Sequence, residues 1–210
     1  MKNEVENVLK FYRLTNTLKD KIRTGWKIWN VDGERLESVA EHIYGTCMVA
    51  IAMKSEYRID VDLMKVIKML VVHETEEIII GDITLFDKVT PEEKKEMGHK
   101  AVREIFNGLN DKEEYVQLIL EFDERKTKEA LFAHMCDKFE CDLQAMMYQE
   151  QGCMDVNNPK NKDVIKDERI QKLMEQGAKT IADFFHYYDM KFYKGEVGKP
   201  FREVIESVKD

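Results

Sequence analysis

The sequence predicts an all-helical protein, and three observations support this fold class. Only 10 glycines and 3 prolines occur among the 210 residues, whereas a protein built of strands needs a turn about every 8–12 residues. Apolar side chains recur at helical spacing, as at Leu63, Val66, Ile67 and Leu70. Charged residues of both signs are interleaved and make up 35% of the chain, which is typical of solvated helical surfaces. We therefore expect a bundle of seven or eight helices with little or no sheet.

Local start and stop signals place these helices along the chain. Ser38 and Thr90 each stand three residues before a glutamate, which is the pattern of a helix-opening capping box. The stretch 21–37 has no sustained apolar period and is expected to be a long loop. The run Ile78–Ile80 fits either a helix end or a short strand, and the helix is preferred because it continues an existing pattern. The helices are expected at about 3–20, 38–55, 60–80 (opened by Asp60), 90–108, 110–125, 127–151, 164–192 with a break near Gly177, and after Pro200.

Composition and charge argue against several classes of protein. The formal net charge of −8 disfavours sequence-independent binding to the phosphate backbone of nucleic acid. No apolar run approaches the roughly 18–20 residues that a membrane-spanning helix needs, and the N-terminal residues lack the apolar core of a signal peptide. The four cysteines form no C-x-x-C pair, so we expect reduced thiols in a cytoplasmic protein.

Histidines and acids in apolar surroundings are the candidates for chemistry. His73 follows the apolar run 69–72 and opens a short segment rich in glutamate. A solvated acidic face is one interpretation, but acids between two apolar runs are costly unless they are paired or bind a metal. His42 lies in the first turn of a capped helix, and Asp137 is an acid in an apolar helix. Pairing of Asp137 with Lys138 or another base is the structural alternative for that residue.

The order and spacing of these residues resemble the pattern of the HD-domain phosphohydrolases. In that family one histidine, a distant His-Asp pair and a much later aspartate converge on a divalent metal within a helical bundle. The matching residues here are His42, His73-Glu74 and Asp137, so Glu74 stands where the family has aspartate. Over about residues 8–150 the chain is similar to the deoxyribonucleoside 5′-monophosphatase (5′-deoxynucleotidase) branch. The segments that carry this similarity are Arg23-Thr24-Gly25-Trp26, Glu37–His42, His73–Thr84, Glu129-Ala130 leading to Asp137, and Leu143-Gln144-Ala145.

The resemblance implies a metal site in a single HD-type domain. That domain would span residues 1–210, with a metal-site core at about 38–150 and C-terminal helices at 164–210. Two imidazoles and two carboxylates suit a transition ion such as Mn²⁺, Co²⁺, Fe²⁺ or Zn²⁺ better than Ca²⁺. One divalent transition metal ion is therefore the expected cofactor. Its expected ligands are His42, His73, Glu74 and Asp137.

The resemblance also implies a reaction, the hydrolysis of (deoxy)nucleoside 5′-monophosphates to a nucleoside and phosphate. Glu77 would orient or deprotonate the attacking water, and Asp82 would assist near the ester oxygen or the sugar. Arg23 would clamp the phosphate, because a planar guanidinium suits two phosphate oxygens. Trp26 would pack on the nucleotide.

Two alternatives to this function stay open. Another HD-type activity would hydrolyse a nucleotide pyrophosphate bond, and a non-catalytic regulatory protein would have lost its metal at Glu74. The presence of Glu77, Asp82 and Arg23 argues against the regulatory alternative. A homodimer is also expected, because relatives of this kind are commonly dimers. The aromatic segment 184–188 offers interface anchors, although its rings serve equally well to close the core.

Overall fold

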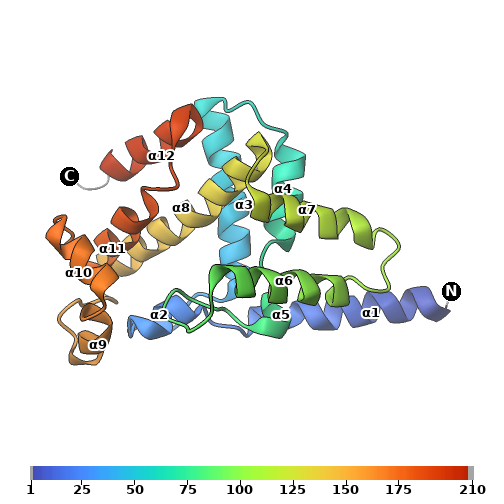
Figure 1. The fold of residues 1–210 in the computed structure, drawn as a ribbon, viewed down its shortest axis with the longest axis horizontal. Coiled ribbons are helices and arrows are strands. Elements are labelled where there is room, and N and C mark those ends of the chain that lie inside the picture. The colour runs from blue at the N-terminus through green and yellow to red at the C-terminus, as the bar shows by residue number, and fades with distance from the viewer. Residues whose placement is uncertain (1, 208–210) are drawn as a thin grey trace.

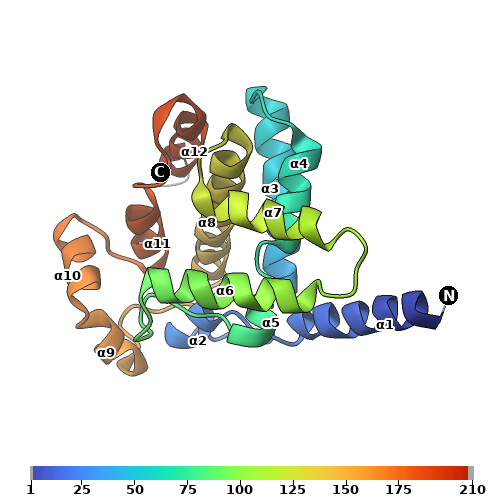
Figure 2. The same cartoon turned by 45° about the vertical axis from the view of Figure 1, so that its right-hand side comes forward.

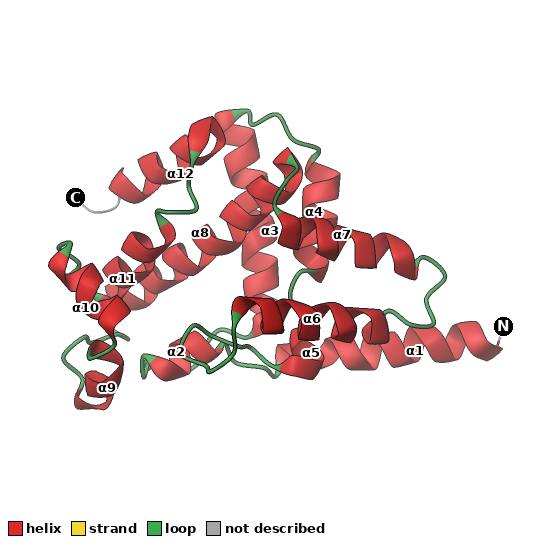
Figure 3. Cartoon of the chain, in the orientation of Figure 1, coloured by secondary structure: helices red, strands yellow, loops and turns green. Residues whose placement is uncertain are grey.

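Helices make up most of the structure. The computed structural model describes residues 2–207, so residues 208–210 of the expected C-terminal helices lie outside the described range. Residues 2–207 contain no β-strand, and the predicted all-helical class is confirmed (Figures 1 and 3). No helix in this range is both long enough and apolar enough to cross a membrane.

The helices of the described range run from α1 to α12, more than the seven or eight expected. Their bounds are α1 Lys2–Asn16, α2 Thr24–Ile28, α3 Val39–Tyr57, α4 Leu63–Val72, α5 Glu77–Ile80, α6 Pro91–Ile105, α7 Lys112–Glu124, α8 Lys128–Glu150, α9 Lys162–Ile165, α10 Glu168–Glu175, α11 Ile181–Asp189 and α12 Gly195–Ser207. Single 3-10 turns occur at η1, Thr17–Lys19, and η2, Pro159–Asn161.

Breaks in two expected helices account for most of the difference. The expected helix at 60–80 ends at Val72, turns at 73–76 and resumes as α5, where Ile78–Ile80 is helical as preferred. The expected helix at 164–192 divides into α9, α10 and α11, with Gly177 at a φ of 107° between the last two. In addition, α2 forms within the expected loop, because five residues suffice for a short helix without a repeating apolar face.

Capping residues fix where the site-bearing helices begin. Both predicted capping boxes are present, at Ser38 for α3 and at Thr90 for α6. Helix α4 is capped by Asp62 rather than by the expected Asp60, because Asp62 accepts from two backbone N–H groups of the first turn. The box at Ser38 has the larger consequence for the site, since it places His42 in the first turn of α3.

The central helix of the fold is α8. It packs against α3, α4, α7, α11 and α12, and it lies in the middle of the molecule in both ribbon views (Figures 1 and 2). Burial of apolar side chains such as Phe132 and Phe139 stabilises this packing. Because helices surround α8, acidic side chains such as Asp137 and Glu140 are buried as well. Buried acids need polar or ionic partners, so α8 is where a site is to be sought.

A second apolar cluster joins α2, the end of α8, α10 and α11. Trp26, Trp29 and Phe184 are among its buried members. The other aromatic rings of the segment 184–188 are partly buried against it. This packing favours core closure over interface formation as the role of that segment.

Candidate active site

Four side chains that lie far apart in the sequence meet between α3, α4 and α8. One candidate ligand atom from each lies within 4.8 Å of all the others. His42 comes from the first turn of α3, His73 caps the end of α4, Glu74 follows in the turn, and Asp137 lies on α8. The structure therefore brings together all four residues that the resemblance implied as metal ligands.

His42 is held by a residue that the sequence analysis missed. Its Nδ1 lies 2.5 Å from Oε2 of Glu140, and its Nε2 lies 3.1 Å from Oδ1 of Asp137. An ionised carboxylate only accepts, so in the neutral ring Nδ1–H donates to Glu140 and Nε2 faces the cluster. Glu140 follows Asp137 by three positions on one helix, and this spacing is the signal that could have found it.

A glycine on α3 makes room for Glu140. A Cβ atom on Gly45 would lie 2.5 Å from Oε1 of Glu140 and 2.9 Å from its Cδ. Because atoms cannot approach this closely, any larger residue at position 45 would displace the side chain of Glu140 from its present position. Gly45 thereby helps to set the orientation of His42, three residues earlier on the same helix.

His73 presents a buried nitrogen that has no partner in the described structure. Its Nδ1–H donates to the carbonyl oxygen of Leu70 over 2.7 Å, which leaves Nε2 as the acceptor. Nε2 makes no hydrogen bond, and it lies 3.6 Å from Oε1 of Glu74 and 3.6 Å from Oδ1 of Asp137. A buried imidazole nitrogen without a hydrogen bond, facing two carboxylates, fits a metal ligand.

The break after α4 is what turns Glu74 toward this cluster. The hydroxyl of Thr75 donates to the carbonyl oxygen of Val72 over 2.7 Å. This bond satisfies one of the carbonyl groups that have no backbone partner at the end of a helix. Oε1 of Glu74 then lies 3.8 Å from Nε2 of His42 and 3.3 Å from Nη1 of Arg23. The longer side chain of glutamate therefore still reaches the position between the two imidazoles.

The charge of the cluster calls for a cation. Burial opposes ionisation of Glu74, but the neighbouring His73 and Arg23 lower its pKa well below the usual range. Burial and Arg23 likewise oppose protonation of His42, yet the surrounding acidic groups raise its pKa well above the usual value. Two imidazole nitrogens and two carboxylates in this environment fit a divalent transition metal ion.

Arg23, Glu77 and Asp82 lie beside the four-residue cluster. Nη1 of Arg23 is 3.9 Å from Oε1 of Glu77 and 3.9 Å from Oδ1 of Asp82. Glu77 is buried, and burial together with the charges of Glu74 and Asp82 raises its pKa to about 11. Asp82 accepts a hydrogen bond from the backbone N–H of Thr24 over 2.6 Å. The arrangement joins a guanidinium to two further carboxyl groups at the edge of the cluster.

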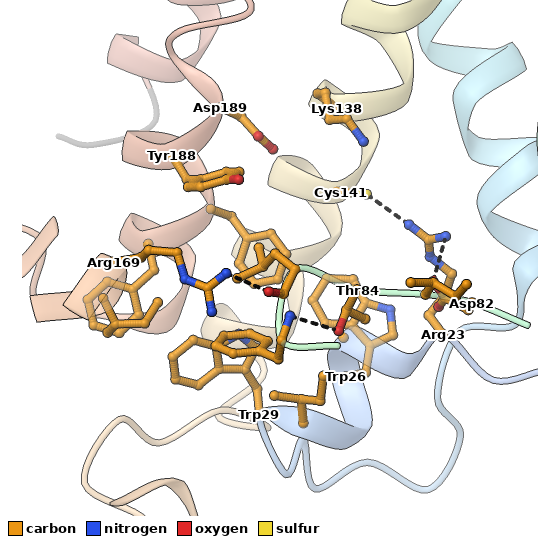
Figure 4. A pocket seen from close by; sticks show the side chains of 18 of the residues that line it. Arg23, Trp26, Trp29, Asp82, Thr84, Lys138, Cys141, Arg169, Tyr188 and Asp189 are labelled. Atoms are coloured by element: carbon orange, nitrogen blue, oxygen red, sulfur yellow. Dashed lines mark hydrogen bonds and ion pairs between the residues drawn. The ribbon is translucent and has the colours of Figure 1, made fainter. Parts of the chain in front are cut away.

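A cavity of about 330 Å³ opens beside these residues (Figure 4). Its polar end is lined by Arg23, Glu74, Glu77 and Asp82. Its other end is largely aromatic and is built by α2, the loop after α5, α10 and α11. The aromatic lining residues are Trp26, Trp29, Phe86, Phe184, Phe185, Tyr188 and Phe192. This volume lies at the lower end of the range of small-molecule sites, about 300–1,000 Å³.

Trp26 forms part of the cavity wall and is firmly held there. Its Nε1–H donates to Oε2 of Glu37 over 2.7 Å, and its ring packs edge-on against Tyr148 at 5.3 Å. The residue is only 2% exposed, so it offers the cavity a fixed surface rather than a movable ring. Trp29 beside it stacks on Phe184 at 5.4 Å and extends the same wall.

Comparisons with known proteins identify the family to which this fold belongs. Residues 15–181 match the family model described as HD domain. A relative named 5′-deoxynucleotidase HDDC2 in Dictyostelium discoideum is 38% identical, and the match covers 70% of this chain and 80% of that one. Its namesake in Homo sapiens is 33% identical over 69% of each chain.

Solved structures show the same fold at lower sequence identity. PH0347 protein from Pyrococcus horikoshii OT3 superposes with a TM-score of 0.67 at 23% identity, covering 97% of each chain. A predicted metal-dependent phosphohydrolase from Magnetospirillum magnetotacticum MS-1 gives 0.62 at 22% identity, covering 98% of this chain and 90% of that one. The family match spans most of the chain, and relatives above 30% identity support it. The chain therefore belongs to the HD domain family.

Proposed function

We propose that this chain is a metal-dependent phosphohydrolase that releases phosphate from deoxynucleoside 5′-monophosphates. The observation that carries the proposal is one continuous site. A cluster of two imidazoles and two carboxylates adjoins the polar end of a cavity, and aromatic rings line the other end. A phosphate needs the first environment and a nucleobase the second. The relatives named 5′-deoxynucleotidase support the same assignment.

The metal would be held by His42, His73, Glu74 and Asp137. A bound Mn²⁺, Co²⁺, Fe²⁺ or Zn²⁺ ion would polarise a phosphoryl oxygen and acidify a water molecule. Glu140 and the carbonyl of Leu70 orient the two imidazoles by accepting from Nδ1–H, which leaves Nε2 of each ring as the nitrogen that would bind the ion. Lys138 offsets part of the remaining negative charge, since its Nζ lies 3.0 Å from Oδ2 of Asp137.

The residues beside the cluster supply the other parts of the reaction. Arg23 would bind the phosphate, because its largely buried guanidinium lies at the polar end of the cavity and points toward the cluster. Glu77 would hold the attacking water, since it is buried directly beside Arg23. It would accept the proton of that water in its ionised form, which a cation bound by the neighbouring cluster would favour over the protonated form. Asp82 would lie near the ester oxygen, and Trp26 would provide a flat surface for the nucleoside.

The proposal is tested by metal analysis paired with a nucleotide panel. Freshly purified and metal-reconstituted protein is assayed for phosphate release from nucleoside mono-, di- and triphosphates. We expect about one transition metal ion per chain and turnover of the deoxynucleoside monophosphates. Pyrophosphate release from triphosphates would instead support the alternative HD activity. Protein that binds no metal and releases no phosphate would support the regulatory alternative.

Variants of Glu74 test the departure from the family pattern. Glu74→Ala is expected to lose tight metal binding and phosphate release together, because it removes a charged ligand. Glu74→Asp keeps the carboxylate and restores the family residue, so it should retain both. If Glu74→Ala keeps its metal and its activity, Glu74 is not a ligand.

We further propose that the active protein is a cytoplasmic homodimer of one HD-type domain. The residues proposed for the metal and substrate all fall between positions 23 and 137, and the C-terminal helices pack on the same unit. All four cysteines are free thiols, in keeping with a reducing compartment. Exposed apolar side chains suited to an interface lie on α1 rather than in the segment 184–188. They are Val5, Val8, Leu9 and Tyr12. Light scattering that gives a monomer mass at micromolar concentration would refute the dimer.

A further inference from the structure

Glu37 lies in the loop before α3 and is hydrogen-bonded to several parts of the proposed site. It is only 7% exposed. Its carbonyl oxygen accepts from the backbone N–H of Arg23 over 3.0 Å, and its own N–H donates to the hydroxyl oxygen of Tyr148 over 2.8 Å. Oε2 of its carboxyl group accepts from Nε1–H of Trp26 over 2.7 Å, and the same carboxyl group hydrogen-bonds to that of Glu140.

These bonds connect parts of the site that the proposed reaction uses together. Arg23 is proposed to bind the phosphate and Trp26 to pack on the nucleoside, and both residues line the cavity (Figure 4). Glu140 orients His42, since its Oε2 lies 2.5 Å from Nδ1 of that ring. Through one carboxyl group, Glu37 therefore joins a wall of the cavity to the residue that orients a proposed metal ligand.

A hydrogen bond between two carboxyl groups requires that one of them carries a proton. Glu140 already accepts from Nδ1–H of His42. Burial and the charge of Glu140 raise the pKa of Glu37 to about 7. Glu37 is therefore the group that donates to Glu140, while its other oxygen accepts from Trp26. A glutamine side chain offers the same pattern of one donor group and one acceptor oxygen, whereas a methionine side chain of similar length offers no comparable donor or acceptor.

We propose that Glu37 is a positioning residue that holds Glu140 and Trp26 at once and so couples the metal site to the wall of the substrate cavity. This inference rests on the proposed nucleotidase function and adds to it a residue that touches neither the metal nor the substrate. Glu37 belongs neither to the four residues proposed as metal ligands nor to the lining of the cavity. Its effect on metal affinity must therefore pass through Glu140, and its effect on substrate binding through Trp26.

Two substitutions at position 37 test this role. Affinity for Co²⁺ is measured by competition with a chelator, and KM is measured with thymidine 5′-monophosphate. Glu37→Met removes both side-chain hydrogen bonds. It should weaken Co²⁺ binding about tenfold, at the low end of the range for partners of metal-bound histidines. It should also raise KM roughly three- to tenfold, the size of a lost neutral hydrogen bond. Glu37→Gln keeps both bonds and should stay close to wild type in both measurements.

Further variants separate a positioning role from a general loss of stability. Trp26→Phe removes only the indole N–H and should raise KM while Co²⁺ affinity stays at its wild-type value. In a Glu140→Ala background, Glu37→Met should weaken Co²⁺ binding little further, because the residue through which it acts is absent. Losses that add in full would show another route and overturn the proposal. Glu34→Met changes an exposed glutamate of the same loop and is the control that should alter neither value.

The remaining outcomes decide the matter in either direction. Wild-type values in Glu37→Met overturn the proposal, as do equal losses in Glu37→Met and Glu37→Gln. If Glu37→Met does not fold, Glu37→Gln is compared with Glu140→Gln, and equal Co²⁺ affinities in these two variants overturn it.

The metal measurement also distinguishes failure of this inference from failure of the proposed function. Wild-type protein that binds Co²⁺ but releases phosphate from no nucleotide would refute the nucleotidase function. The Co²⁺ affinities of the Glu37 variants would then still test the link to Glu140, and calorimetric binding of thymidine would replace KM as the test of the link to Trp26. Wild-type protein that binds no Co²⁺ overturns the proposal.

Discussion

The two ends of the active-site cavity are built in different ways. At the end that adjoins His42, His73, Glu74 and Asp137, each imidazole is held by a hydrogen bond, to Glu140 or to the carbonyl of Leu70. At the aromatic end, shape comes from ring packing such as that of Trp29 on Phe184. Hydrogen bonds fix the orientation of the two imidazole rings, whereas ring packing fixes the shape and volume of the aromatic end of the cavity. Changes at the first end should therefore affect metal and rate, and changes at the second should affect substrate choice.

Glu77 gives the largest expected effect and the sharpest test of that contrast. Glu77→Gln removes the proposed proton acceptor but none of the four residues proposed for the metal. We expect metal content to stay at its wild-type level while kcat falls about 10²- to 10⁴-fold, the range typical of a lost acid–base group. Loss of metal in this variant would show that Glu77 belongs to the cluster itself.

Glu140 should give a smaller effect of a different kind. Glu140→Gln replaces a charged acceptor for Nδ1–H of His42 by a neutral one. Such partners of metal-bound histidines typically contribute 10- to 100-fold in metal affinity, so a loss of about that size is expected. Competition with a chelator measures it. If affinity is unchanged while KM rises, Glu140 acts on the substrate end instead.

His134 lies on α8, three residues before Asp137, and does not line the cavity. A change at His134 should therefore affect the stability of the fold rather than metal content or substrate binding. Its ring lies against Phe122 and Phe192, and burial lowers its pKa to about 4. Between pH 6.5 and 4 the unfolded chain binds this proton and the folded protein does not, so stability falls as pH falls. We expect wild type to lose about 2 kcal/mol more than His134→Phe between pH 7.5 and 5. Denaturant unfolding at both pH values measures the difference, and equal losses would contradict it.

Arg169 should give the smallest effect, confined to the aromatic end. Its guanidinium lies over the ring of Phe86 at 5.1 Å and donates to the carbonyl of Leu85, so it holds the loop after α5 against α10. Arg169→Gln should raise KM roughly three- to tenfold with kcat and metal unchanged, because a half-exposed contact contributes little. Lys172→Gln, an exposed change on the same helix, is the control. A fall in kcat or in metal content would contradict the expectation that changes at the aromatic end affect only substrate binding.

The difference between the two ends of the cavity also explains which features could be predicted from the sequence. Capping boxes at Ser38 and Thr90 are local patterns, and both helices begin where expected. The joint position of His42, His73 and Asp137 followed from resemblance to a family rather than from local pattern. The break after Val72 was missed, because the apolar residues before it, 69–72, and after it, 78–80, fit one helical pattern. The hydrogen bond from the hydroxyl of Thr75 that marks the break leaves no periodic signal in the sequence.

The aromatic end was largely beyond sequence reasoning. Trp26 was identified through the resemblance, but Trp29 and Phe86 were not singled out. The segment 184–188 was expected to serve an interface or to close the core. Which side chains line one cavity depends on how α10 and α11 return to α2, and no spacing along the chain encodes that packing.

Gly45 limits how far this protein can be made more heat-resistant. Glycine within a helix costs about 0.5–1 kcal/mol relative to alanine, so a routine stabilisation scheme would replace it. Here the added methyl group would meet Glu140, the acceptor that orients His42. Selection for thermal tolerance alone would accept alanine and displace Glu140 from Nδ1 of His42. Position 45 is thus one where selection for activity and selection for stability favour different residues.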